Sequence, residues 1–246
     1  MRPAVLALAA SLAAAPLFPA CAAEQVDVAL VLVGDVSRSI DAGEYTLEKQ
    51  GYAAALTSKQ VLAAIAGGEH GAIAVAYVEF AGVAEVRNVL DWAVVRDAPS
   101  AGAFAARLVA APRSYVGRTA IGEAIAFART VLAESGYPGA RQVIDVCGDG
   151  TSNAGQPVTA ARDAAVAAGI TVNGLAIIND HPASYMFAHV QPPGGLTNYY
   201  RQNVIGGPGA FALEVHDFPS FGVAFARKLV QEIAARPAGA GQFADR

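Results

Sequence analysis

The sequence predicts an α/β protein with a doubly wound (Rossmann-like) fold, in which a mostly parallel six-stranded sheet has helices on both faces. Apolar runs of strand length alternate with longer segments that have helical spacing, which indicates β-α-β units. The run at 26–33 is continuously apolar after Asp27, as expected for a strand covered on both faces. Only Ala81 and Gly82 are expected to link the second and third strands, so that pair should be antiparallel at one edge of the sheet.

The individual elements follow from periodicity and from helix-end signals. Asp41 and Glu44 have the spacing of a capping box, so a helix should begin there. Residues 179–209 are the least regular part of the chain and contain a short Tyr-rich helix. The expected strands cover 26–33, 71–80, 141–147, 170–178 and 211–215, with a further strand inside 83–95 that ends near Asp91 and Trp92. The longer helices are expected to cover 45–65, 100–109, 120–134, 157–168 and 218–235.

Composition limits the classes of function. The chain has 246 residues, 54% of them hydrophobic and 15% charged, which suits one domain with a well-buried core. The formal net charge is −4, and the Lys and Arg residues are scattered along the chain. Neither a nucleic-acid-binding stripe nor an anionic-membrane patch is therefore expected.

The first residues are expected to be a secretory signal peptide, residues 1–23. Arg2 precedes an uncharged Ala/Leu-rich run, and small residues at 20–23 resemble a cleavage site. A lipoprotein site at Cys21 is the alternative, but Phe18 and Pro19 make a poor lipoprotein box. The mature protein should then be periplasmic or secreted, with one domain at 24–236 and a fraying tail at 237–246. No other stretch has the apolar length of a membrane span.

Cysteine usage excludes an internal disulfide in the mature chain. The sequence has two cysteines, and Cys21 lies in the expected signal peptide, so Cys147 would be left alone. Cys147 ends a predicted strand, and no His occupies a recognisable partner position. A buried structural thiol is the preferred interpretation.

Oxygen-bearing side chains follow two of the predicted strands. With the strand order 3-2-1-4-5-6, the sheet order reverses between the first and fourth strands, where ligands bind in such folds. Asp35 follows the first strand and Asp149 the fourth, while Ser37, Ser39 and Thr119 can add hydroxyl oxygens. Two carboxylates with hydroxyls and water suit a hard cation such as Mg²⁺, with Mn²⁺ or Ca²⁺ as alternatives.

The same residues carry a family resemblance. The pattern D-x-S-x-S at 35–39, followed by Thr119 and then by Asp149-Gly150, resembles the metal-ion-dependent adhesion site (MIDAS) of von Willebrand factor A (vWA) domains. Segments 117–122, 143–150 and 204–211 are similar to an exported bacterial family of unknown function with this fold. The resemblance implies a magnesium-type ion held by those five residues, with an open position filled by an Asp or Glu carboxylate of a protein partner.

Three residues depart from the vWA pattern. Arg38 stands at a position that is often small, where it would either crowd the site or attract an acidic partner. Gly34 replaces a more usual apolar residue and is expected to loosen the turn into the loop. Asp145 lies inside a predicted buried strand, where it needs partners, and a structural hydrogen-bonded role is preferred to one behind the metal ligands.

A binding module is preferred to an enzyme. A metal-dependent hydrolase with an ion-activated water is the alternative, but no His or further acid is placed as a general base. A scaffold with a vestigial metal site is the third possibility. Glu79 is interpreted as an edge or loop contact, and the aromatic residues at 185–187 and 199–200 as packing beneath loops. The histidines lack zinc-site spacing: His70, His181, His189 and His216.

Overall fold

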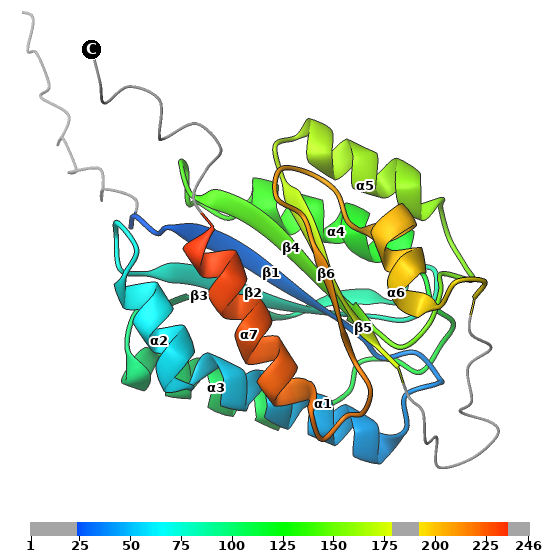
Figure 1. The fold of residues 1–246 in the computed structure, drawn as a ribbon, viewed down its shortest axis with the longest axis horizontal. Coiled ribbons are helices and arrows are strands. Elements are labelled where there is room, and N and C mark those ends of the chain that lie inside the picture. The colour runs from blue at the N-terminus through cyan, green and yellow to red at the C-terminus, as the bar shows by residue number, and fades with distance from the viewer. Residues whose placement is uncertain (1–23, 179–191, 236–246) are drawn as a thin grey trace, which may run out of the picture.

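A computed structural model describes residues 24–178 and 192–235, and it has a central six-stranded sheet between two layers of helices (Figure 1). The strand order is β3-β2-β1-β4-β5-β6, as predicted. Every neighbouring pair is parallel except β2 and β3, which are antiparallel. The order reverses beside β1, so the carboxyl ends of β1 and β4 are adjacent, and loops from distant parts of the sequence meet there.

The strands agree closely with the predicted ones. They are β1 (Val28–Asp35), β2 (Ile73–Phe80), β3 (Val86–Val95), β4 (Arg141–Gly148), β5 (Thr171–Ile177) and β6 (Ala212–Val215). Strands β1, β2 and β5 are buried along their whole length, which explains their continuous apolar runs.

Alternate residues of each central strand serve two separate cores. In β1, Leu30 and Leu32 pack with the helices of one layer, while Val31 and Val33 pack with those of the other. The first layer contains α1 (Ala42–Leu56), α2 (Lys59–Ala66), α3 (Ala98–Ala110) and α7 (Phe221–Ala234) (Figure 1). The second contains α4 (Ile121–Ala133), α5 (Val158–Ala167), α6 (Leu196–Tyr199) and the π-helical turn η2 (Tyr200–Val204).

The prediction of one helix over 45–65 is wrong, because the segment forms two helices. Thr57 follows the last residue of α1, and its hydroxyl donates to the Ala53 carbonyl at 2.8 Å. Ser58 has an extended conformation and caps α2 by accepting from the Val61 N–H at 3.3 Å. Hydroxyl side chains that bond to local backbone groups compete with helix continuation, which explains the break. The capping box of Asp41 and Glu44 at the start of α1 is confirmed.

The predicted two-residue hairpin link is also too short. Strand β2 ends at Phe80 and β3 begins at Val86, so residues 81–85 form the connection. Ala84 has φ of 61°, and the Glu85 carboxylate accepts from the Gly82 N–H at 2.8 Å. This loop therefore makes its own tight turn, and β3 starts three residues later than predicted.

None of the described helices combines the length and the apolar character that a membrane crossing requires. The predicted signal peptide at 1–23 and the tail after residue 235 lie outside the described residues.

Helices α1 and α7 cross at a pair of glycines, so Gly51→Ala is expected to destabilise the fold. A Cβ at Gly51 would lie 2.5 Å from Phe221 Cδ1 and 3.0 Å from the Gly222 backbone nitrogen. We expect a loss of about 1–3 kcal/mol of unfolding free energy in urea titrations. Gly102→Ala on α3 is the matched control, since a Cβ there meets nothing within 4 Å. It should gain about 0.5–1 kcal/mol; equal effects of the two substitutions would contradict the tight crossing.

Candidate metal centre

The first half of the predicted site is the loop of residues 35–39 at the carboxyl end of β1, called the metal-binding loop after its predicted role. Asp35 is the last residue of β1 and is fully buried, and the Ser37 N–H donates to its Oδ1 at 2.7 Å. The Val36 N–H donates to the Phe80 carbonyl at 2.8 Å, which holds the loop to β2. The carboxylate is thus fixed by its own loop rather than by a distant partner.

A chain of hydrogen bonds joins this loop to Asp149. The hydroxyls of Ser37 and Ser39 share a hydrogen bond of 3.0 Å, and Ser39 Oγ donates to Asp149 Oδ1 at 2.9 Å. Asp149 follows β4 directly and is 1% exposed. A Cβ at Gly148 would lie only 3.0 Å from Asp35 Oδ2, so glycine is needed there for the Asp35 side chain to lie against β4.

Thr119, the fifth predicted ligand, is held by the loop that follows β4. Its N–H donates to Asn153 Oδ1 at 3.0 Å, and its carbonyl accepts from the Asn153 N–H at 2.8 Å. Ala120 donates its N–H to the Ala81 carbonyl, and α4 begins at the next residue. Thr119 therefore lies at a junction of three loops, although it is 84 positions from Asp35 in the sequence.

These side chains border one open cavity of about 240 Å³. Its lining consists of Ser37, Arg38, Ser39, Gly117, Arg118, Thr119 and Asn153. The three hydroxyl residues reach it directly, and both aspartates lie behind them. No group of three or more His, Cys, Asp or Glu side chains suited to a metal occurs in residues 24–178 and 192–235. The oxygens present, two carboxylates and three hydroxyls, still fit a hard cation with water in its shell; their role as ligands stays a prediction.

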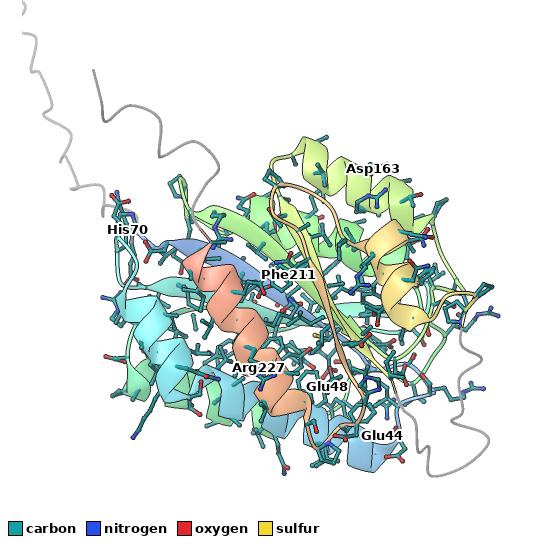
Figure 2. The ribbon with its side chains drawn as sticks, viewed as in Figure 1. Glu44, Glu48, His70, Asp163, Phe211 and Arg227 are labelled. Atoms are coloured by element: carbon teal, nitrogen blue, oxygen red, sulfur yellow. The ribbon has the colours of Figure 1, made fainter. Side chains whose placement is uncertain are left out.

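Sequence reasoning missed Glu48, a buried acid beneath the site. Glu48 is 1% exposed on α1 and faces the interior, whereas Glu44, one turn earlier, lies at the edge of the molecule (Figure 2). Burial raises the pKa of Glu48 well above its usual value, and the charge of Asp35 raises it further. Glu48 is therefore a further acid near the site, but it does not line the cavity, so the interpretation that no acid is placed as a general base is unchanged. The sequence could have indicated this position, because Glu48 has helical spacing from Tyr52 and Ala55, with which it shares the buried face of α1.

The role predicted for Gly34 is also wrong. Gly34 lies within β1, in register with Glu79 on one side and Cys147 on the other, so it does not loosen the turn. A Cβ at this position would lie 2.8 Å from the Tyr77 hydroxyl and 3.4 Å from Glu48 Oε1. Glycine makes room for polar side chains that other residues would displace.

Glu79 is buried at the centre of a network rather than at an edge, which corrects the prediction. It is fully buried, and its Oε1 accepts from the Tyr45 hydroxyl at 2.8 Å and the Tyr77 hydroxyl at 3.3 Å. Its Oε2 accepts from the Ser114 N–H at 2.8 Å. Burial, and then the charge of Glu79, raise the pKa of Tyr77 well above its usual value. Glu79 thereby fastens the loop that leads to Thr119 onto β2.

Arg113, from the same loop, clamps the metal-binding loop. Its Nη2 donates to the carbonyls of Val36 and Ser37 at 2.8 Å each and of Ile40 at 2.9 Å. The guanidinium also lies over the Tyr45 ring, 5.5 Å from its centre. One cation thus gathers three carbonyls of the loop and sets the direction in which the serine hydroxyls point.

Replacing Arg113 by glutamine should weaken cation binding without unfolding the protein. Loss of charged hydrogen bonds to three carbonyls frees the loop, and we expect a roughly tenfold lower Mg²⁺ affinity in calorimetric titration. Arg227→Gln is the control, because Arg227 is exposed on α7 (Figure 2). An Arg113→Gln protein that binds Mg²⁺ as tightly as the control would show that the clamp is irrelevant to the site.

Asp145 belongs to a separate buried network, as the preferred structural interpretation requires. Lys228 Nζ lies 2.5 Å from Asp145 Oδ1 and also bonds to Glu232 one turn along α7. Glu232 Oε1 in turn accepts from the Asn173 amide at 2.7 Å. Burial raises the pKa of Glu232 from 4.5 to about 7, with the Asp145 charge as the next cause. This network ties β4 and β5 to α7.

The remaining candidates have structural positions. Cys147 is a buried thiol, and burial raises its pKa, so the structural interpretation holds. Tyr200 is fully buried, and the Tyr199 hydroxyl accepts from the Ser152 N–H at 3.2 Å. His70 and His216 are exposed. Residues 185–187, His181 and His189 lie outside the described residues.

Comparison with solved structures shows that the fold is that of a vWA-like domain. The vWA protein of Catenulispora acidiphila matches with a TM-score of 0.60 at 16% identity, over 85% of this chain and 43% of that one. Proximal thread matrix protein 1 of the mussel byssus, with a zinc-occupied MIDAS motif, matches at 0.59 and 17%, over 85% and 48%. The pilus adhesin SpaC of Lactobacillus rhamnosus GG matches at 0.57 and 14%, over 86% and 31%.

The chain belongs to the family described as "Protein of unknown function (DUF1194)", whose model matches residues 25–237. It spans less than half the length of the three solved structures named above. No curated protein is similar enough in sequence to count as a match.

Proposed function

We propose that this chain is an exported binding module that holds a divalent cation at the β1–β4 edge and uses it to capture a carboxylate of a protein partner. The observation that carries the proposal is the hydrogen-bonded series Ser37, Ser39 and Asp149 on an open cavity. These residues come from two distant segments, yet their oxygens meet where Thr119 also reaches the cavity. Asp35 supports the series through the Ser37 N–H.

The donor set favours capture of an anion. Two carboxylates balance the +2 charge of the ion without exceeding it, and the three hydroxyls are neutral, so an open position on the ion can still accept an external anionic oxygen. Asp35 and Asp149 are almost fully buried and cannot themselves reach a partner. The hydroxyl groups at the cavity surface would position the incoming carboxylate.

Binding is favoured over hydrolysis. A general base must contact the water that it activates, and the described residues lining the cavity include no His, Asp or Glu. Glu48 and Glu79 are 1% and 0% exposed, and Tyr and backbone groups surround Glu79. The similarity in fold to an adhesin and to a MIDAS-bearing matrix protein also supports a binding role.

Export remains part of the proposal and rests on the sequence of residues 1–23 alone. The basic start, the apolar run and the small residues at 20–23 support a cleaved signal peptide, and hence a periplasmic or secreted protein. N-terminal sequencing of the protein purified from its native host tests this. A start near residue 24 supports cleavage, and a blocked, lipidated Cys21 would contradict it.

Water relaxation of the Mn²⁺-loaded protein tests the proposed capture. A short peptide with one Asp should displace water from the bound ion and reduce the proton relaxation enhancement. The same peptide with Asn in place of Asp is the matched control and should leave the enhancement unchanged. Equal responses to the two peptides would contradict carboxylate capture.

A further inference from the structure

Two arginines border the cavity beside the predicted ligands. Arg38 lies between Ser37 and Ser39, and Arg118 directly precedes Thr119. Both residues are exposed and line the cavity. The cavity of about 240 Å³ stays open beside Arg38, which favours the alternative that this residue attracts an acidic partner over the one in which it crowds the site.

The two arginines are held at neighbouring points of the rim. The Arg38 N–H donates to the carbonyl of Gly117 at 2.9 Å, and Gly117 directly precedes Arg118. This hydrogen bond holds the backbone of Arg38 beside that of Arg118, although the two residues belong to different loops. Arg118 Nη2 donates to the Asn153 carbonyl at 2.6 Å, and its Nε to Asn153 Oδ1 at 3.3 Å. Arg118 is thus oriented by Asn153, the same residue that holds the Thr119 N–H.

Arg38 is left available for a partner. Its guanidinium makes no hydrogen bond or ion pair with any residue in 24–178 or 192–235. The nearby acid Glu85 turns its carboxylate to the Gly82 N–H, at 2.8 Å, instead of to the arginines. Two positive side chains therefore flank the site on a chain whose formal net charge is −4.

We propose that the partner presents two carboxylates, one for the cation position and a second for the Arg38–Arg118 rim. This inference rests on the proposed function and narrows its partner to an acidic segment with paired Asp or Glu residues. A single carboxylate would occupy the cation position alone, and among the described residues Arg38 would be left without a partner group and Arg118 bonded only to Asn153. Arginine is suited to the second contact because its planar donors match a carboxylate in a bidentate arrangement.

Peptide binding to the full mature protein in Mg²⁺ tests this inference. The probes are two-Asp peptides of equal length, with zero to three residues between the two acids. The control for each is the one-Asp peptide in which Asn replaces the second Asp. The wild type should bind the best two-Asp peptide about tenfold tighter than its Asn control, a preference that falls at high salt. In Arg38→Gln/Arg118→Gln the preference should shrink to about twofold or less. Arg227→Gln should keep it.

Separate outcomes identify which proposal fails. Equal wild-type affinities for the one-Asp and two-Asp peptides, or a preference unchanged in the double variant, would overturn the paired-acid inference while leaving carboxylate capture intact. Absence of Mg²⁺-dependent binding by every peptide would overturn the proposed function, and the inference with it. Mg²⁺ affinity without peptide is measured in parallel, so that any effect of the double substitution on the cation position is separated from its effect on the peptide; loss of two positive charges beside the site should leave that affinity equal to or tighter than in the wild type.

Discussion

Replacing Lys228 by methionine is expected to remove about 3–5 kcal/mol from the unfolding free energy at neutral pH. Lys228 is fully buried and lies between Asp145 and Glu232, which are 0% and 1% exposed. Methionine can fill the space of the side-chain stem, but it leaves two buried acids without their cation. Uncompensated buried charge is among the few causes of destabilisation this large.

The pH dependence of this variant distinguishes charge from packing. Lys228 lowers the pKa of Glu232, which burial has raised from 4.5 to about 7, so its removal should raise that pKa further. The folded variant then binds more protons than the unfolded chain above about pH 4.5, and its stability falls as the pH rises through that window. The wild type shares this slope up to about pH 7, so the deficit of the variant should grow as the pH rises above about 7.

Urea titrations at pH 5 and pH 7.5 measure both effects. Arg227→Met, at the preceding exposed position of α7, is the matched control and should change stability by less than about 0.5 kcal/mol at either pH. A Lys228→Met loss below about 1 kcal/mol, or one that does not depend on pH, would contradict the account of a charged buried network.

Replacing Asp149 by asparagine should abolish divalent-cation binding while the fold is kept. Asparagine can still accept the hydrogen bond from Ser39 Oγ, now 2.9 Å from Asp149 Oδ1, so the loops stay joined. One of the two carboxylates of the predicted ligand set is lost, and a hard cation depends on that charge. We expect at least a hundredfold lower Mg²⁺ affinity.

Thermal unfolding with and without Mg²⁺ measures this second effect. At a Mg²⁺ concentration about 100 times its dissociation constant, a ligand specific for the folded state stabilises the wild type by about 2.7 kcal/mol. The Asp149→Asn protein should show no such rise. Asp163→Asn is the control, since Asp163 is exposed on α5 (Figure 2) and pairs with Arg162. A full Mg²⁺ response in Asp149→Asn would exclude that residue as a ligand.

The arrangement of the sheet could be predicted because its signals are local. Continuous apolar runs mark buried strands, and helix-length connections require parallel neighbours, so the ends of β1 and β4 had to meet. The site followed from this order, because Asp35 is the last residue of β1 and Asp149 directly follows β4. The break at Ser58 and the length of the 81–85 loop depend on single side-chain hydrogen bonds, which hydrophobic periodicity does not predict.

The buried charges could not be predicted in the same way. Lys228 and Glu232 have the i, i+4 spacing of an ordinary surface pair, and only the contact with Asp145 on β4 explains why they are inside. Arg113 and Glu79 act through contacts between residues more than 30 positions apart. Such contacts form only when the loops have their folded positions, so neither composition nor hydrophobic periodicity predicts them.

Calorimetric titration of the chelator-treated mature protein with Mg²⁺ and Mn²⁺ tests the central claim most directly. The account predicts saturable binding of one ion per chain, lost in the Asp149→Asn variant. Absence of binding by the wild type, or binding that persists unchanged in that variant, would contradict a cation site at the junction of β1 and β4.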